Sequence, residues 1–463
     1  MTFQQETIRM VGKIAIAALL TVGTATAESQ REAEIAAVRA MAELEMHPPE
    51  IKMNPTFEDF APRVFRYRMN GGAVQMHFKK SVKYPEDWGF AMNAGVSVTR
   101  NGRLWATWFG GEDGPEAFVI GAKSDDGGKT WSDPAFVLDP HFKDDRILDI
   151  FPVMRGVVIA ETWVDPDGAL HLLASITVGT PMVRGCIWDY VCRDPDAATP
   201  IWEKPRFMGW GSTHNTPTVL RDGAWIVPVE LEGGVSADCF PELVALRGVG
   251  SLRSEDRGRT WTRSNSVKVK GTGHVCENCI VERSDGTLWM LMRTGLGIHE
   301  AFSTDGGRSW SEARRAEWID NPISRFSFLR LKSGSLLLVK NGDSVASCDG
   351  KNHRNKLKAY ISRDEGKSWS AGYELDMRGW ADYPDAEQGP DGRIAISWGV
   401  DRRGLAEIRC AFLTEEEIAA GKTIGKDNFG GVRVFRSVPA AEWKGSTRAK
   451  SSFGIWEDSS MNK

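Results

Sequence analysis

An eight-residue pattern, S-x-D-x-G-x-[TS]-W, occurs four times and constrains the fold of this chain more than any other feature. Its copies are Ser124–Trp131, Ser254–Trp261, Ser303–Trp310 and Ser362–Trp369. In each copy we expect the Asp to accept hydrogen bonds from turn amides, the Gly to adopt a positive φ and the Trp to pack beneath neighbouring strands. The pattern therefore predicts structural turns on the outer rim of a repeated β-structure. It predicts no catalytic or metal-binding role for these Asp residues.

Hairpin turns between β-rich runs form a second periodicity. They lie at Asn101-Gly102, Asp167-Gly168, Asp222-Gly223, Asp285-Gly286, Ser333-Gly334 and Asp391-Gly392. Successive turns are roughly 50–65 residues apart, which is the length of one four-stranded antiparallel unit with its loops. Six such units predict an all-β fold, a six-bladed β-propeller. A capping box from Thr414 to Glu417 predicts a short helix after the last unit.

The N-terminus has the pattern of a secretory signal peptide. Arg9 and Lys13 precede an apolar stretch and the small residues Ala25-Thr26-Ala27. The apolar stretch is much shorter than the ~20 residues that span a bilayer. We therefore expect cleavage after residue 27 and a secreted or periplasmic protein without a membrane span.

The rest of the chain divides into three parts by composition. Residues 28–70 are predicted to be an N-terminal helical and extended segment, with an amphipathic helix from Glu28 to Met46. Residues 71–437 are predicted to form the propeller, and residues 438–463 a polar C-terminal tail.

Charge and cysteine content exclude several classes of protein. The chain has 58 Lys and Arg against 62 Asp and Glu, so it lacks the basic surface of a nucleic-acid-binding protein. Seven cysteines are an odd number for a disulfide framework. We interpret Cys276 and Cys279 as core residues, whereas Cys186 and Cys192 flank an expected loop and could pair in an oxidising compartment. No calcium-loop or nucleotide-binding motif is present, so we predict no metal or cofactor.

The boxes and the six units together resemble the sialidase (neuraminidase) superfamily, from about Phe90 to Phe412. Sialidases have a Glu nine residues before the Gly of one hairpin and an Arg seven residues after it, positions held here by Glu277 and Arg293. A second family Arg lies eight residues before a box Ser, here Arg354. The family's Tyr nucleophile lies nine residues before the Gly of the last hairpin, here Tyr383. The resemblance implies these catalytic and carboxylate-binding roles.

Two family positions match less well. The family's first Arg lies ten residues before the first hairpin Gly, where this chain has Met92. The family's acid Asp lies in the loop after that hairpin, and Asp113 is the nearest candidate, although Glu112 or Glu116 could serve instead. The missing Arg leaves open whether the substrate is sialic acid or a related nonulosonic or uronic acid.

Two further residues are candidate substrate contacts. His214 precedes a predicted strand at a position of the kind that faces a pocket, and a hydrogen-bonded structural histidine is the alternative. Arg325 begins one unit at its inner end, where it could help to bind the substrate.

The chemistry of these residues leads to a functional hypothesis. A guanidinium group binds a carboxylate bidentately, so converging arginines predict an acidic sugar. A neutral Tyr, activated by a Glu, avoids the repulsion that a carboxylate nucleophile would meet from such a substrate. Asp113 would protonate the leaving oxygen. We therefore predict an exo-acting, retaining glycosidase of sialidase type that acts on an acidic glycan.

Two other classes of function stay open. In a uronate-polysaccharide lyase, the arginines would neutralise the uronate while Tyr383 or His214 abstracts the neighbouring proton. In a non-catalytic carbohydrate-binding propeller, the same residues would bind a glycan without turnover.

Overall fold

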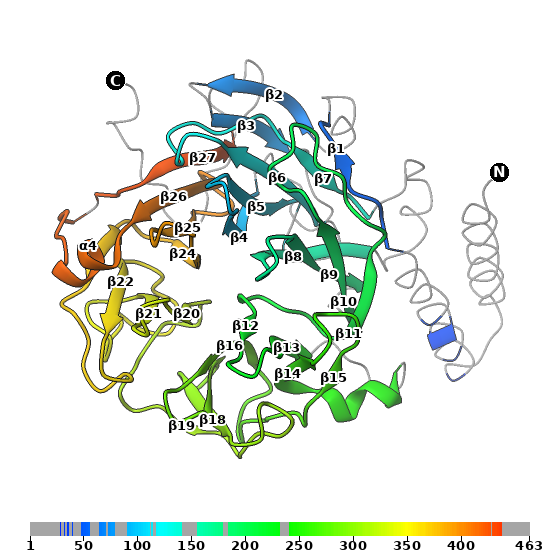
Figure 1. Cartoon of the computed structure of the whole chain (residues 1–463), viewed down its shortest axis with the longest axis vertical. Helices are drawn as coiled ribbons and strands as arrows, with labels where there is room; N and C mark the ends of the chain where they lie inside the picture. Colours follow the sequence, from blue (N-terminus) through cyan, green and yellow to red (C-terminus); the bar gives the residue numbers. More distant parts are fainter. Residues whose placement is uncertain are drawn as a thin grey trace.

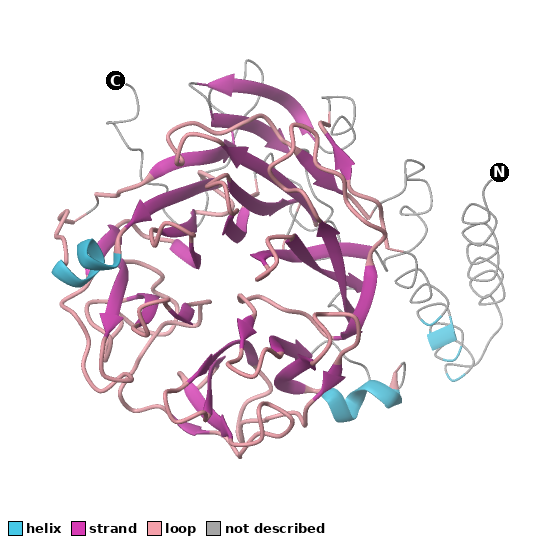
Figure 2. Cartoon of the chain, viewed as in Figure 1, coloured by secondary structure: helices cyan, strands magenta, loops and turns pink. Residues whose placement is uncertain are grey.

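Six antiparallel sheets surround a central axis in the computed structural model of the chain (Figure 1). The structure describes residues 48–55, 64–70, 73–78, 90–111, 113, 117–140, 155–178, 184–231, 240–426 and 428–437, with residues 28, 32, 35, 36 and 39. Strands dominate these residues (Figure 2), which confirms the all-β, six-bladed propeller. The predicted signal peptide, most of the N-terminal helix and the C-terminal tail lie outside the described residues.

Each blade is one sheet whose strands run in sequence order, with the first strand nearest the axis (Figure 1). Blade 1 is β4 (Met92–Val98), β5 (Leu104–Gly110), β6 (Phe118–Ser124) and β7 (Phe136–Leu138); blade 2 is β8 (Arg155–Val164), β9 (Leu170–Val178), β10 (Arg184–Cys192) and β11 (Arg206–Trp210); blade 3 is β12 (Thr218–Val219), β13 (Trp225–Leu231), β14 (Gly248–Ser254) and β15 (Thr262–Arg263). Blade 4 is β16 (Val275–Glu282), β17 (Leu288–Thr294), β18 (His299–Ser303) and β19 (Arg314–Arg315); blade 5 is β20 (Ser327–Arg330), β21 (Leu336–Asn341), β22 (Leu357–Ser362) and β23 (Tyr373–Asp376); blade 6 is β24 (Ala381–Gln388), β25 (Ile394–Val400), β26 (Glu407–Leu413) and β27 (Val432–Ser437).

Strands from the N-terminal side of the chain complete two blades. β1 (Lys52–Met53) pairs with β7 at the edge of blade 1. β3 (Ala73–Phe78) pairs in parallel with β27, and β2 (Val64–Asn70) pairs with β3, so that both strands extend blade 6. β2 comes from the segment that we expected to precede the propeller. Its sheet therefore contains strands from both ends of the described chain.

The predicted turns and boxes are confirmed. All six hairpin dipeptides join the first and second strands of a blade, and Gly286 in blade 4 has a φ of 86°. In the first box, Asp126 accepts hydrogen bonds from the Thr130 amide at 2.9 Å and the Thr130 hydroxyl at 2.6 Å, which lower its pKa to about 2. The same bonds recur in the other three boxes, each after the third strand of its blade.

One helix forms as predicted, and one cysteine prediction is wrong. Thr414 and Glu417 form a reciprocal capping box at the start of α4 (Glu415–Ala420); a short 3₁₀-helix, η4, covers Pro241–Leu246. Cys186 and Cys192 do not form a disulfide with each other, because they lie near opposite ends of the extended strand β10, too far apart for that bond. No helix in the described part of the chain has the length and apolar character of a bilayer-spanning segment.

Arg325 lies at the centre of the propeller, immediately before β20 of blade 5. Its side chain is 0% exposed. The guanidinium donates hydrogen bonds to the Ala94 carbonyl of blade 1 at 2.6 Å, to Glu161 of blade 2 at 2.8 Å and to Asp385 of blade 6 at 2.8 Å. It also donates to the side-chain oxygen of Asn215, which precedes blade 3, at 3.0 Å. One side chain therefore links five blades.

The remaining blade joins this cluster through Asn215. Its amide nitrogen donates to the backbone carbonyl of Glu277, in blade 4, at 3.0 Å. Burial and the neighbouring charge of Asp385 raise the pKa of Glu161 well above its usual range, although Arg325 opposes the shift. Burial raises the pKa of Asp385 as well, and the one guanidinium of Arg325 serves both buried carboxyl groups.

We expect Arg325→Met to destabilise the protein by about 3–5 kcal/mol, because it leaves buried carboxyl and carbonyl groups without their donor. Urea unfolding of the variant measures this loss. Arg193→Met is the matched control: Arg193 is 56% exposed and pairs with Glu203 at the surface, so its removal costs at most about 1 kcal/mol. Equal losses in the two variants would contradict a central role for Arg325.

Candidate active site

Two inner strands carry a bulge that directs a side chain towards the axis. The register of β16 shifts between Cys276 and Cys279, and that of β24 shifts between Asp382 and Asp385. Within these bulges, Glu277 has a φ of 49° and Tyr383 a φ of 54°. A left-handed conformation in a residue other than glycine costs on the order of 1–3 kcal/mol and is concentrated at functional sites. β8 also carries such a bulge, with buried Ile159 at a φ of 71°, so the bulge is a feature of the inner strands rather than of the site alone. It is the polar side chains at this position that mark Glu277 and Tyr383 as candidates for function.

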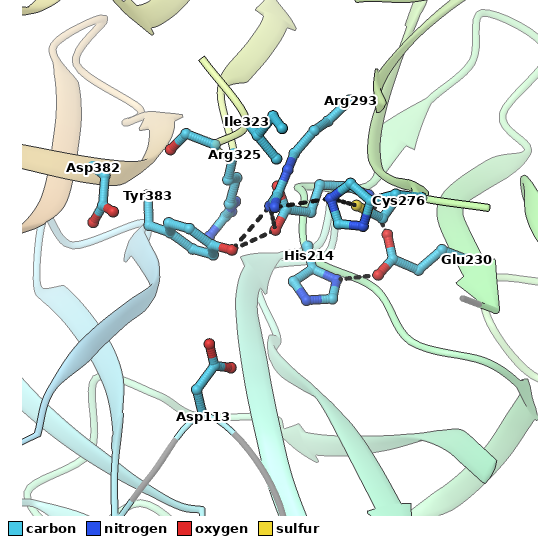
Figure 3. A network of polar contacts seen from close by, with 12 residues as sticks. Asp113, His214, Glu230, Cys276, Arg293, Ile323, Arg325, Asp382 and Tyr383 are labelled. Atoms are coloured by element: carbon cyan, nitrogen blue, oxygen red, sulfur yellow. Dashed lines mark hydrogen bonds and ion pairs between the residues drawn. The ribbon is translucent and has the colours of Figure 1, made fainter. Parts of the chain in front are cut away.

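Tyr383, Glu277 and Arg293 form a closed set of contacts (Figure 3). The Tyr383 hydroxyl donates to Glu277 Oε1 at 2.6 Å and accepts from Arg293 Nη1 at 3.0 Å. Arg293 also forms an ion pair with Glu277. All three side chains are buried, and they come from β24, β16 and β17. The phenol thus has both an acceptor for its proton and a cation beside its oxygen.

The pKa shifts define the protonation states of this set. Burial alone would raise the pKa of Glu277, but the charges of Arg293 and His214 and the bond from Tyr383 lower it to about 2. Burial and the Glu277 charge raise the pKa of Tyr383 above its usual value, with Arg293 partly opposing the shift. At neutral pH, Tyr383 is therefore a phenol and Glu277 a carboxylate. The proton can move to Glu277 only as the phenol oxygen reacts.

Two histidines and a second Glu support this set from behind. The Glu277 amide donates to Glu230, and His214 Nδ1 lies 3.2 Å from the other Glu230 oxygen. Arg293 Nη2 donates to His274 Nε2 at 3.0 Å, so that nitrogen of His274 acts as the acceptor. Glu230 thereby fixes the backbone of Glu277, and His214 lies next to Glu230 (Figure 3).

An open cleft of about 270 Å³ lies beside the Tyr383 ring. Its lining residues are Asp113, Asn352, Arg354, Trp380, Asp382, Asp401, Arg402 and Arg403. Arg354 Nη1 and Arg402 Nη2 each donate to the same oxygen of Asp382 at 2.8 Å. The guanidinium carbons of Arg354 and Arg402 lie 5.5 and 4.6 Å from the centre of the Tyr383 ring. The cleft therefore presents two cations next to the phenol.

Asp113 lies on the open side of this cleft. Its side chain is 36% exposed and accepts a hydrogen bond from Arg402 Nη1 at 3.3 Å. In Figure 3 its carboxylate points towards Tyr383 and His214, with no contact drawn to either. A solvent-accessible carboxyl group in this place can exchange protons with a bound ligand or with water. Glu112 and Glu116, the alternatives to Asp113, lie outside the described residues.

The predicted site residues lie in different parts of the structure. Tyr383, Glu277 and Arg293 are in direct contact, and Arg354 and Asp113 line the cleft beside them. His214 is 11% exposed and contacts Glu230 rather than Tyr383. Arg325 belongs to the buried cluster at the propeller axis, where its guanidinium is occupied by protein groups. We therefore exclude it from the substrate contacts.

Sequence reasoning missed four residues of the site. Asp382 could have been found, because it directly precedes Tyr383 on the same strand. Glu230 and His274 contact Glu277 and Arg293 from neighbouring strands and loops, and Arg402 reaches Asp382 from the loop between β25 and β26. These three carry no local signal. Among the described residues there is no cluster of three or more His, Cys, Asp or Glu side chains arranged for a metal ion.

The six blades and their repeated boxes define a β-propeller of the BNR-repeat type. The chain belongs to the family described as "BNR repeat-like domain", whose model matches residues 102–396. It is 26% identical to the anhydrosialidase of Macrobdella decora over 179 residues, which cover 35% of this chain and 23% of that protein. The chain thus matches less than a quarter of this relative's length.

Solved structures with the same fold include two sialidase-type enzymes. The intramolecular trans-sialidase from Ruminococcus gnavus, in complex with oseltamivir carboxylate, has a TM-score of 0.51 at 14% identity, over 72% of this chain and 95% of that one. A Hadza microbial sialidase has a TM-score of 0.53 at 18% identity, over 71% of this chain and 66% of that one. At these identities, the likeness establishes the fold.

The lowered pKa of Glu277 has a measurable effect on stability. Because it is lower in the folded protein than in the unfolded chain, ionised Glu277 contributes stability that is complete above about pH 4.5 and is lost towards pH 2. The contribution is on the order of 3 kcal/mol. In urea unfolding, the stability difference between wild type and Glu277→Gln should stay constant above pH 5 and narrow below pH 4.5. Glu312→Gln, at an exposed residue, is the control. If the stability difference between wild type and Glu277→Gln stays unchanged down to pH 3, the lowered pKa of Glu277 is contradicted.

Proposed function

We propose that this protein is an exported, exo-acting glycosidase of sialidase type that releases a terminal acidic sugar with retention of configuration, Tyr383 being the nucleophile. The observation that carries the proposal is the hydrogen bond from the Tyr383 hydroxyl to Glu277, with Arg293 donating to the same hydroxyl oxygen. This arrangement gives the phenol a base and also stabilises the phenolate character that develops during attack. Residues 1–27 are proposed to direct export.

The reaction has two displacements. In the first, the Tyr383 oxygen attacks the anomeric carbon and its proton passes to Glu277, while Asp113 protonates the departing glycosidic oxygen. In the second, Asp113 removes a proton from water, the water oxygen attacks the anomeric carbon, and the Tyr383 oxygen leaves and recovers its proton from Glu277. Two inversions at one carbon give net retention.

The cations around Tyr383 support an acidic substrate. Arg293, Arg354 and Arg402 all lie next to the phenol ring or its hydroxyl. A substrate carboxylate on the anomeric carbon would be attracted by these guanidinium groups. The same substrate carboxylate would repel an Asp or Glu nucleophile, but not a neutral Tyr. The relatives named above as sialidases and trans-sialidases are consistent with such a substrate.

The lyase alternative is less well supported by the same geometry. A lyase needs a base to abstract a proton, but the pKa of Tyr383 is raised by burial and by Glu277, which disfavours a free phenolate. His214 contacts Glu230 behind the catalytic set. The binding-only alternative gives no reason for two strained residues that place a phenol against a carboxylate.

The products of sialylated and uronate-capped oligosaccharides discriminate among these functions. We expect a free acidic sugar that has gained one water, with no ultraviolet absorbance. An absorbing product without added water would identify a lyase. A non-absorbing product without added water would identify an intramolecular transfer from the same Tyr383 intermediate, and an absence of turnover would contradict the enzyme proposal.

Tyr383→Phe should lower turnover by at least ~10³-fold, because it removes the attacking oxygen while keeping the ring packed in place. Tyr373→Phe is the matched control: Tyr373 lies on the outer strand β23 of blade 5, and its loss should leave turnover unchanged. Mass spectrometry of released sugar measures both. Full turnover in Tyr383→Phe contradicts the proposed nucleophile.

Asp113→Asn should affect substrates according to their leaving groups. For an alkyl glycoside we expect kcat/KM to fall by about 10²–10⁴-fold, because the departing oxygen needs a proton. For a 4-nitrophenyl glycoside, whose leaving group departs as a stable anion, we expect a much smaller loss in kcat/KM. Equal losses for the two substrates would exclude Asp113 as the acid and direct attention to Glu112 and Glu116.

A further inference from the structure

We propose that Arg402 supplies the guanidinium of the substrate-carboxylate site that the sequence lacks at Met92, and that Asp382 positions it beside Arg354. The inference rests on the proposed function and specifies how its substrate class is recognised. It assigns to blade 6 a contact that the sequence resemblance placed in blade 1.

The backbone of Arg402 lies next to the vacated position. Its carbonyl oxygen accepts a hydrogen bond from the Ala91 amide at 3.0 Å, and Ala91 directly precedes Met92. The inner strands β4 and β24 are neighbours around the axis, as Figure 1 shows. Met92 itself is 2% exposed and packs in an apolar cluster with Phe90 and Phe109, so it offers a ligand no polar group. An arginine from either blade can therefore reach the same region.

The side chain of Arg402 extends to the reactive phenol. Its guanidinium carbon lies 4.6 Å from the centre of the Tyr383 ring, closer than that of Arg354 at 5.5 Å. Both arginines line the same open cleft. A carboxylate bound to this pair would lie beside the Tyr383 ring, and the anomeric carbon that bears it would have to reach the Tyr383 hydroxyl for attack.

A single carboxylate holds the two arginines together. Asp382 Oδ2 accepts one hydrogen bond from each guanidinium, both at 2.8 Å. The Asp382 side chain is 2% exposed, whereas Arg354 is 15% and Arg402 11% exposed. Asp382 lines the same cleft but is the most buried of the three, so the guanidinium groups present more surface to an entering ligand. Its charge offsets the repulsion between two adjacent cations and keeps them in place without a ligand.

The contact between Arg402 and Asp113 links recognition to proton transfer. Arg402 Nη1 donates to Asp113 at 3.3 Å while Nη2 donates to Asp382. The same guanidinium thus lies between the proposed proton donor and the carboxylate behind the cleft. Removal of Arg402 should weaken binding of the carboxylate and also release Asp113 from its position.

The test compares oseltamivir carboxylate with its ethyl ester, in which the same carboxyl group is neutral and carries an ethyl group, and measures binding of both by calorimetry on the full chain. We expect the wild type to bind the carboxylate at least about tenfold more tightly than the ester. Arg402→Met should abolish this preference by weakening the carboxylate alone. Arg193→Met, which removes one exposed positive charge outside the cleft, should change the preference by less than about threefold and controls for a general charge effect.

A second variant covers the case in which Arg402→Met does not fold. Arg402→Lys keeps a charge beside Asp382 but loses the planar fork, and we expect it to reduce the carboxylate preference by about three- to tenfold. The inference is overturned if a folded Arg402 variant keeps the full preference for the carboxylate. It is also overturned if the wild type shows no such preference or binds neither ligand. Failure of the proposed function looks different: the preference and its loss in Arg402 variants would persist without turnover.

Discussion

The cluster around Arg325 is the interaction on which the rest of this structure depends. A propeller joins its blades mainly through neighbouring faces, so the inner ends of six sheets have to be held at a common depth along the axis. Arg325 does this with bonds to Ala94, Glu161, Asn215 and Asp385, and Asn215 passes the connection to Glu277. The carbonyl of Glu277 thus belongs to the structural cluster, while its carboxylate contacts Tyr383 and Arg293 in the candidate active site. The strained backbone of Glu277 is held by this bond and by Glu230.

Charge balance explains how so many ionisable groups can share one end of the axis. Arg293 pairs with Glu277, and Arg354 and Arg402 share Asp382, so each buried cation has a carboxylate within contact. Buried ion pairs are expensive to desolvate and are kept where they serve function or specificity. Here they hold three guanidinium groups close to one phenol. In the proposed reaction, a substrate carboxylate would meet cations that are already oriented, which lowers the ordering cost of binding.

The parts of the structure that could be predicted are those encoded locally. A hairpin or a box is specified by its own few residues. Tyr383, Glu277, Arg293 and Arg354 were located through the resemblance to sialidases, which places such residues at set distances from these turns. Arg402, Glu230 and His274 could not be found in this way, because their contacts depend on which loops and strands meet across blades. For Arg325, the sequence correctly indicated the inner end of its blade but suggested a contact with the substrate. A linear pattern does not show how deeply a side chain is buried along the axis. The prediction that Cys186 and Cys192 could pair was wrong for a related reason. Their spacing of six residues is compatible with a loop, but in the structure these residues form the extended strand β10.

Covalent trapping of Tyr383 tests the account most directly. In a sialosyl fluoride with a second fluorine next to the anomeric carbon, that second fluorine slows both displacements. The fluoride at the anomeric carbon is a good leaving group and restores the rate of the first displacement, so the glycosyl-enzyme accumulates. Peptide mass spectrometry of the trapped protein should find the sugar attached to the peptide that contains Tyr383, and Tyr383→Phe should remain unlabelled. Turnover of substrate by a protein that gives no adduct, or an adduct on another residue, would contradict the assignment of Tyr383 as the nucleophile.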